Sequence, residues 1–102
     1  MLPERDRIRR SVAGAALGLA EDCARLGLLS EGQAAARRSL ELDRYQDRAW
    51  DLLTALYERA GDRAAAARAR WEHGAALSEL RITAVSRVPQ PRARPTVVPL
   101  GG

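Results

Sequence analysis

Two residues of this chain, His73 and Cys23, carry side chains that could do acid–base or nucleophilic chemistry at neutral pH, and each residue type occurs once. A histidine exchanges a proton near pH 7, and a cysteine thiolate is a nucleophile. Either role needs a base and an orienting group close by. Both residues instead stand three or four positions from apolar residues, which is the spacing of one helix face. We therefore expect His73 to be a packing or edge residue and Cys23 to be a buried thiol.

The carboxylates are numerous, but they stand beside arginines at the spacing of neighbours on one helix face. Asp6 with Arg10 and Glu21 with Arg25 are such pairs, which are typical of a solvated helix surface. The sequence shows no glycine-rich phosphate loop and no cysteine and histidine spacing of the kind that binds a metal ion. We therefore predict that the protein is not an enzyme, with no catalytic, cofactor-binding or metal-binding residues and no cofactor.

The net charge of +4 comes from the C-terminal part of the chain. Residues 1–80 hold thirteen arginines and thirteen acidic residues, which cancel, and the excess lies in Arg81, Arg87, Arg92 and Arg94. A neutral body does not form the basic patch that follows a phosphate backbone. Weak nucleic-acid binding through the basic tail is an alternative function. Direct nucleic-acid binding is not expected, because the tail arginines lack interleaved aromatic residues.

Composition and periodicity place these residues on helices. Hydrophobic residues make up 46% of the chain, 20 of them are alanine, and β-branched residues are few, which favours an all-α fold. Apolar residues at spacings of three and four predict helices over residues 4–26, 31–42, 47–60 and 63–80. The inner face expected for the first helix comprises Ile8, Val12, Ala16, Leu19, Cys23 and Leu26. The inner face expected for the fourth comprises Ala66, Ala69, His73, Ala76, Leu77 and Leu80.

The predicted helices form two hairpins that repeat along the chain, and the period is the separation of Gly27 and Gly61 in the sequence. We call this separation the repeat offset. It matches the length of a tetratricopeptide repeat, in which bulky residues fill the space between helices, glycine makes the turn and small residues allow close crossing. The second hairpin fits this pattern better than the first. The expected repeat core comprises Leu19, Cys23, Gly27, Trp50, Leu53, Tyr57, Gly61 and Ala66. We therefore predict two antiparallel hairpins stacked as tetratricopeptide-like repeats.

The segment from Trp50 to Ala66, with the sequence WDLLTALYERAGDRAAA, resembles a particular subtype of this repeat. It looks like the bacterial transcriptional activator domain of the Streptomyces antibiotic regulatory protein family, and the similarity extends over about residues 5–80. The resemblance implies a helical module that helps dimerisation and regulatory contacts. In full members of the family, a winged-helix DNA-binding domain precedes this module.

The chain departs from the family pattern in three ways. No winged helix precedes Met1, and a proline-rich segment replaces the usual helices after Leu80. Arg70 stands where the family usually has an aromatic or apolar residue, and Trp71 is displaced by one position. The missing winged helix and the proline-rich segment indicate a fragment or a truncated relative of a transcriptional regulator, so sequence-specific DNA binding is not carried over. A generic tetratricopeptide adaptor is the alternative.

A second stripe on the fourth helix is the candidate partner face, and it comprises Ala64, Ala67, Trp71, Ala75 and Ser78. In a longer array this stripe would pack against the next repeat. This stripe either faces a partner or is covered by the tail valines Val85, Val88, Val97 and Val98. A third alternative is that Trp71 packs within its own hairpin. Two repeats are fewer than the three usually needed for stability. We therefore expect self-association, as a dimer through the fourth helix, or contact with a transcription-regulatory protein.

The composition changes after residue 82, where four prolines, Pro89, Pro91, Pro95 and Pro99, follow in close succession. Proline interrupts helices and core strands, so we predict a helical-repeat domain over residues 1–82 and a disordered Pro/Arg-rich tail over residues 83–102. No apolar run approaches the about 20 residues of a membrane span, and the start is charged where a signal peptide is apolar. We expect a cytoplasmic protein without a membrane partner.

Overall fold

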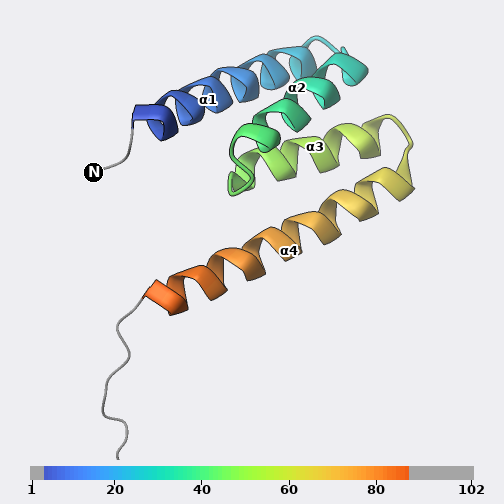
Figure 1. Ribbon diagram of the computed structural model, residues 1–102. Coiled ribbons are helices and arrows are strands. Elements are labelled where there is room, and N and C mark those ends of the chain that lie inside the picture. Colours follow the sequence, from blue (N-terminus) through green and yellow to red (C-terminus); the bar gives the residue numbers. More distant parts are fainter. Residues whose placement is uncertain (1–3, 88–102) are drawn as a thin grey trace, which may run out of the picture.

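The computed structural model describes residues 4–87, with side chains as far as residue 82. These residues form four α-helices: α1 (Glu4–Arg25), α2 (Leu29–Leu42), α3 (Asp47–Arg59) and α4 (Arg63–Arg87). Each helix packs against the next one in the sequence, and α1 also touches α3. The chain therefore runs back and forth through one stack of helices (Figure 1). The expectation of an all-α fold is confirmed, and the bounds of α1, α2 and α3 lie close to the predicted ones.

The turns that close the two hairpins have the same backbone conformation. Gly27, between α1 and α2, has a φ of 77°, and Gly61, between α3 and α4, has a φ of 80°. Glycine adopts this left-handed conformation without the clash of a Cβ atom. The backbone hydrogen bonds of the first turn recur in the second at the repeat offset: Gly27 to Ala24 and Gly61 to Glu58, Leu28 to Cys23 and Asp62 to Tyr57. The starts of α2 and α4 are separated by the same offset.

The core lies along the middle of the stack, and α3 supplies most of its large side chains. Leu53 and Leu56 are the largest fully buried side chains among the described residues, and Trp50 and Tyr57 add bulk from the same helix. The neighbouring helices contribute mostly alanine, which lets helices approach closely. The main buried cluster comprises Leu17, Ala20, Ala35, Ala36, Leu40, Ala49, Trp50, Leu53, Tyr57, Ala65, Ala66 and Ala69.

The inner face of α1 is not the one that the sequence pattern predicted. Its buried residues are Ala13, Leu17, Ala20 and Cys23. The predicted stripe is wrong at Ile8, Val12, Leu19 and Leu26, which are exposed. The reason is the close crossing of the first hairpin. A Cβ atom on Gly32 of α2 would lie 3.4 Å from the Cβ atom of Cys23 and 3.5 Å from the carbonyl oxygen of Ala20. The crossing therefore lies on the side of α1 with the small residue Ala20 and leaves the stripe with Leu19 outside.

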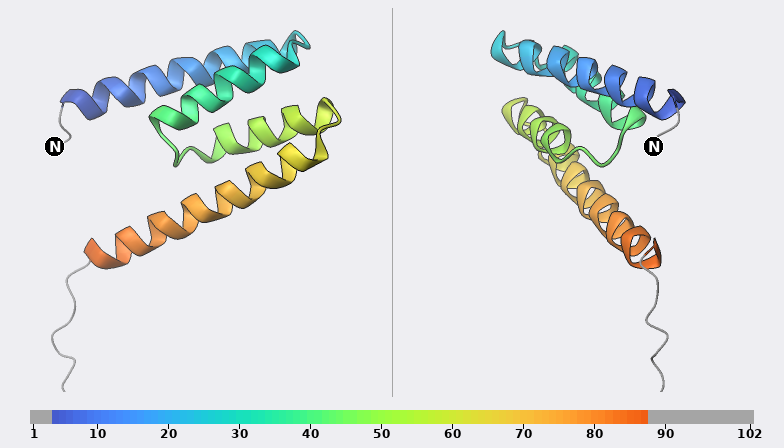
Figure 2. Two further views of the ribbon diagram at one scale, coloured as in Figure 1. Left: turned by 45° about the vertical axis from the view of Figure 1, so that its right-hand side comes forward. Right: turned by 90° about the vertical axis from the view of Figure 1, so that its left-hand side faces the viewer.

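The end of α4 also differs from the prediction, because the helix continues past Leu80 to Arg87. The first proline of the C-terminal segment is Pro89, and extending an existing helix costs little until a proline follows. Residues 83–87 are therefore helical instead of belonging to a tail, and the rest of the predicted tail lies outside the described residues. Leu77 and Leu80 are exposed, not inward-facing, since the 25-residue α4 extends beyond the 13-residue α3 (Figure 2).

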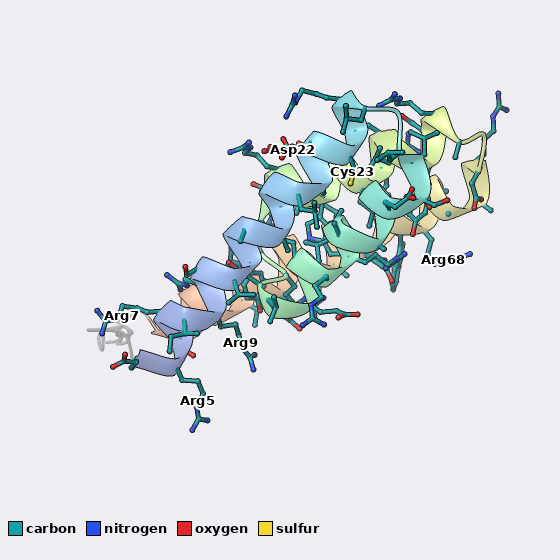
Figure 3. The ribbon with its side chains drawn as sticks, turned by 90° about the horizontal axis from the view of Figure 1, so that it is seen from above. Arg5, Arg7, Arg9, Asp22, Cys23 and Arg68 are labelled. Atoms are coloured by element: carbon teal, nitrogen blue, oxygen red, sulfur yellow. The ribbon has the colours of Figure 1, made fainter. Side chains whose placement is uncertain are left out.

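The N-terminal part of α1 extends beyond its partner in the same way, because α1 has 22 residues and α2 has 14. We call residues 4–12 the α1 overhang and residues 77–87 the α4 overhang. Both lie at the end of the stack opposite the glycine turns (Figures 1 and 2). Seen from above, Arg5, Arg7 and Arg9 project outward from the α1 overhang (Figure 3). Within residues 4–87, none of the helices combines the length and apolar character needed to cross a membrane.

Candidate functional site

His73 lies on α4 and packs against the start of α3. Its ring stacks on Trp50, with the ring centroids 5.8 Å apart and an interplanar angle of 11°. Its Nε2 atom lies 2.8 Å from Oδ1 of Asp47, and the Trp50 indole donates a hydrogen bond of 2.8 Å to the Arg44 carbonyl. These contacts fix α4 against α3 and the connection before it. His73 is thus the packing residue that its spacing predicted.

Cys23 is a buried free thiol near the C-terminal end of α1 (Figure 3). The close approach of Gly32 leaves the thiol shielded from solvent, and reactive cysteines are partly exposed. Across the described part of the chain, no group of three or more histidine, cysteine, aspartate or glutamate side chains is placed to hold a metal ion. Within the described residues, neither His73 nor Cys23 therefore belongs to a group of this kind.

The charged side chains mostly connect one helix to another. Glu21 of α1 pairs with Arg48 of α3, not with Arg25 as predicted, and Arg25 pairs with Asp22. The connections to α4 are Arg70 with Glu58, Arg37 with Glu72 at 3.8 Å, and Arg44 with Glu79 at 3.3 Å. Exposed pairs of this kind contribute little to stability, and they lie where α2, α3 and the connection between them face α4.

Tyr45, in the connection between α2 and α3, holds the beginning of the α4 overhang. Its hydroxyl donates a hydrogen bond of 2.8 Å to Oε1 of Glu79. This bond is the main reason that the pKa of Tyr45 lies above its ordinary value, because the phenol must keep its proton to donate it. Polar contacts thus hold the beginning of the overhang, just after Ala76, the last of the buried alanines of α4 among the described residues.

The predicted partner face of α4 lies on the outside of the stack. We call it the α4 stripe, and it comprises Ala64, Ala67, Trp71, Ala75 and Ser78; Ala75 is partly buried and the other four are exposed. Trp71 is 73% exposed, so this indole does not pack within its own hairpin. The other two interpretations, a protein partner or the C-terminal valines, concern surfaces beyond the described residues.

An apolar groove between α1 and α2 was not predicted from the sequence. We call it the α1–α2 groove, and its lining comprises Val12, Ala15, Ala16, Leu19, Glu31, Ala34, Ala35 and Arg38. It lies on the face turned away from α3, because α2 uses Gln33 and Arg37 to hydrogen-bond to α3. The signal was present in the stripe of Val12, Ala16 and Leu19, but that stripe was assigned to the core.

The second hairpin has an equivalent groove, and there the first hairpin covers it. Moving the groove residues along the sequence by the repeat offset gives Gln46, Ala49, Trp50, Leu53, Ala65, Arg68, Ala69 and Glu72. Five of these, Ala49, Trp50, Leu53, Ala65 and Ala69, are buried in one cluster with residues of α1 and α2. The molecule therefore contains the same groove twice, once covered and once open.

The residues of the expected repeat core are not all buried. Leu19 is exposed, whereas Cys23, Trp50, Leu53, Tyr57 and Ala66 are buried, and Gly27 and Gly61 form the turns. Of the arginines that carry the excess charge, Arg81 is exposed on α4. The side chains of Arg87, Arg92 and Arg94 lie outside the part that the structure describes.

No family model, curated protein or solved structure matches this chain. The candidate site is therefore defined by its geometry. It consists of an exposed stripe with a tryptophan on α4, the last helix, and an open apolar groove between α1 and α2, the first two helices.

Proposed function

We propose that this chain is a protein–protein interaction module without enzymatic activity, and that the α4 stripe is the surface that contacts its partner. The observation that carries this proposal is the 73% exposure of Trp71. Tryptophan is among the residues that contribute most to binding at interfaces, because it buries a large apolar area when it enters a pocket. Ala67 and Ala75, one turn before and after it, leave the indole free to insert into a partner.

The two hairpins are proposed to be tetratricopeptide-like repeats. Support comes from the glycine turns, their hydrogen bonds and the starts of α2 and α4, which all recur at the repeat offset. Arrays of such repeats usually end in a repeat with a polar outer face, which keeps the array soluble. The α4 stripe carries a tryptophan and three alanines instead. This apolar composition supports the proposal that another protein covers this end of the array.

The regulatory context of the module rests on the resemblance of residues 50–66 to the bacterial transcriptional activator domain. We propose that the module makes the contacts of a transcriptional regulator. Affinity capture from the native cell, with the native chain and the Trp71→Ala variant as baits, tests this context. RNA polymerase or a regulator retained by the native chain and lost with the variant supports it. Unrelated partners in their place would favour a generic tetratricopeptide adaptor.

Sedimentation velocity at micromolar concentrations tests the surface itself. We expect the native chain to associate and Trp71→Ala to weaken this association about 30-fold, the effect of removing an interface residue worth about 2 kcal/mol. Leu26→Ala is the matched control, because Leu26 is 71% exposed but lies outside both the α4 stripe and the α1–α2 groove. A folded native monomer that Trp71→Ala leaves unchanged, with no captured partner, would contradict the proposal.

A further inference from the structure

We infer that the α4 stripe of one copy docks in the α1–α2 groove of a second copy, so that the copies stack head to tail. This inference rests on the proposed interaction function and specifies the partner as the chain itself. Its basis is that one chain already contains the corresponding contact, because the first hairpin covers the groove of the second hairpin.

Within the chain, α2 covers that second groove through Gln33, Ala36, Arg37 and Leu40. Ala36 and Leu40 belong to the buried cluster that also holds Trp50 and Leu53. Arg37 donates a hydrogen bond of 2.8 Å to the hydroxyl of Tyr57 and lies 3.8 Å from Glu72. The residues of α4 found one repeat offset later are Ala67 and Trp71 of the α4 stripe and, beside them, Arg70 and Gly74, and all four are exposed. The covering face of the first hairpin therefore has an uncovered equivalent on α4.

The two open faces are chemically complementary when α4 of one copy takes, on the groove of the second copy, the position that α2 has on the second groove within the chain. Trp71 takes the place of Arg37, and Arg38 of the second copy takes the place of Glu72, so the indole lies beside a guanidinium. An arginine over a tryptophan ring is attracted by the ring electrons. Val12, Ala16 and Leu19 supply the apolar wall of the groove.

The charges around Trp71 match the groove as well. Arg70, which also pairs with Glu58 of its own chain, takes the place of Ala36, and Glu31 of the second copy takes the place of Ala65. Both alanines belong to the buried cluster between the two hairpins. The arrangement therefore brings Arg70 towards Glu31, a pair of opposite sign. Complementary charges of this kind favour one orientation of docking over others.

The unequal helix lengths support the same arrangement. In the proposed stack of copies, α1 of the second copy packs against α4 of the first copy in the way that α3 packs against α2 within one chain. Because α1 and α4 are longer than α3 and α2, the α1 overhang of the second copy runs alongside the α4 overhang of the first. Both overhangs carry exposed apolar residues, namely Ile8 and Val12 on α1 and Leu77, Leu80 and Ile82 on α4. Stacking would bury these residues together.

This contact joins two different faces, so a stack of copies always keeps one free groove at one end and one free stripe at the other, and it can add further copies. A symmetric dimer through α4, in contrast, pairs stripe with stripe and leaves both grooves open. The two arrangements differ in how the protein responds when only the groove is blocked.

Two full-length variants, each blocked on one face, make the test. Trp71→Glu blocks the α4 stripe and leaves the groove intact, whereas Leu19→Glu blocks the groove and leaves the stripe intact. Leu19 is 57% exposed, so the substitution does not disturb the core; circular dichroism verifies folding. Leu26→Glu is the matched control for a charge on an exposed leucine outside the groove. Sedimentation velocity is measured for each chain and for the equimolar mixture.

We expect the native chain and Leu26→Glu to grow beyond two copies as concentration rises, and each blocked variant alone to be monomeric. Their mixture is expected to form a complex of two chains that does not grow, because one intact stripe meets one intact groove. A monomeric mixture would overturn the inference. So would a Leu19→Glu variant that associates like the native chain; if Trp71→Glu still abolishes association in that case, the α4 stripe remains a binding surface and the proposed function stands.

The C-terminal valines are the rival occupant of these faces. A native chain that stays monomeric, while the Val97→Glu, Val98→Glu double variant associates, would show that the chain covers its own face and would overturn the head-to-tail contact. Association of the native chain that this double variant leaves unchanged supports it.

Discussion

The two hairpins have the same turn and period, but equivalent residues in them have opposite surroundings. Leu53 of the second hairpin is 0% exposed, and Leu19, its equivalent in the first hairpin, is 57% exposed. Trp50 is buried in the second groove, whereas Ala16 lines the open first groove. The difference arises because the first hairpin covers the second and nothing among the described residues covers the first. In a stacked fold, the neighbouring hairpin decides whether a position belongs to the core.

The largest difference in stability between the hairpins is expected for the pair Leu53→Ala and Leu19→Ala. Removing the buried Leu53 side chain leaves a cavity and is expected to lower the free energy of unfolding by about 2–5 kcal/mol. The same change at exposed Leu19 is expected to cost less than about 0.5 kcal/mol. Urea denaturation followed by circular dichroism measures both, at a concentration where the chains are dissociated. Equal losses would mean that Leu19 is buried in solution and would break the comparison.

The glycine turns provide the next test, because here the two hairpins should behave alike. Gly27→Ala and Gly61→Ala are each expected to cost about 1–2 kcal/mol, the penalty of a left-handed backbone with a Cβ atom. A Cβ atom at either position meets no other atom within 4 Å, so the cost reports the backbone alone. The shift in the urea midpoint at a constant slope measures it. A turn that tolerates alanine without loss would show that the two turns are not equivalent.

A smaller difference is expected between two polar bridges at equivalent positions. Ser39 is fully buried, donates a hydrogen bond of 2.8 Å to the Ala13 carbonyl and accepts one of 2.7 Å from Gln46. Its counterpart in the second hairpin is the partly exposed pair of His73 with Asp47. Ser39→Ala is expected to cost about 1–2 kcal/mol, and Asp47→Ala less than about 1 kcal/mol. Thermal unfolding monitored by circular dichroism compares them, and a larger loss for Asp47→Ala would contradict the expected order.

The smallest effect concerns Tyr45, whose hydrogen bond to Glu79 joins the α2–α3 connection to α4. The pKa of Tyr45 is raised in the folded chain above its usual value of 10.0. The stabilisation is therefore present below about pH 10 and is lost as the pH rises through the folded pKa. Phenolate absorbance, with Tyr45→Phe identifying the signal of Tyr45, should show an earlier titration in Glu79→Ala. An unchanged titration would mean that the hydrogen bond does not form in solution.

Local sequence signals were sufficient to predict the helices and turns. Capping glycines and apolar spacing predicted the bounds of α1, α2 and α3 closely, because these features act within a few residues. The stripe that contains Trp71 was also distinguished from the inner face of α4, by its position relative to Ala66 and Ala69. The end of α4 was predicted too early, since the density of prolines after residue 88 was extended to residues 83–87, which contain none.

What the sequence by itself determined is two left-handed glycine turns, the offset between them and four helices. What only the tertiary structure decided is which side of each helix is covered. α1 has two apolar stripes, one with Leu17 and one with Leu19, and periodicity predicts that either can face inward. The structure selects Leu17, because the smaller residues beside it permit the close crossing at Gly32. The stripe with Leu19 is thereby left as the wall of an open groove.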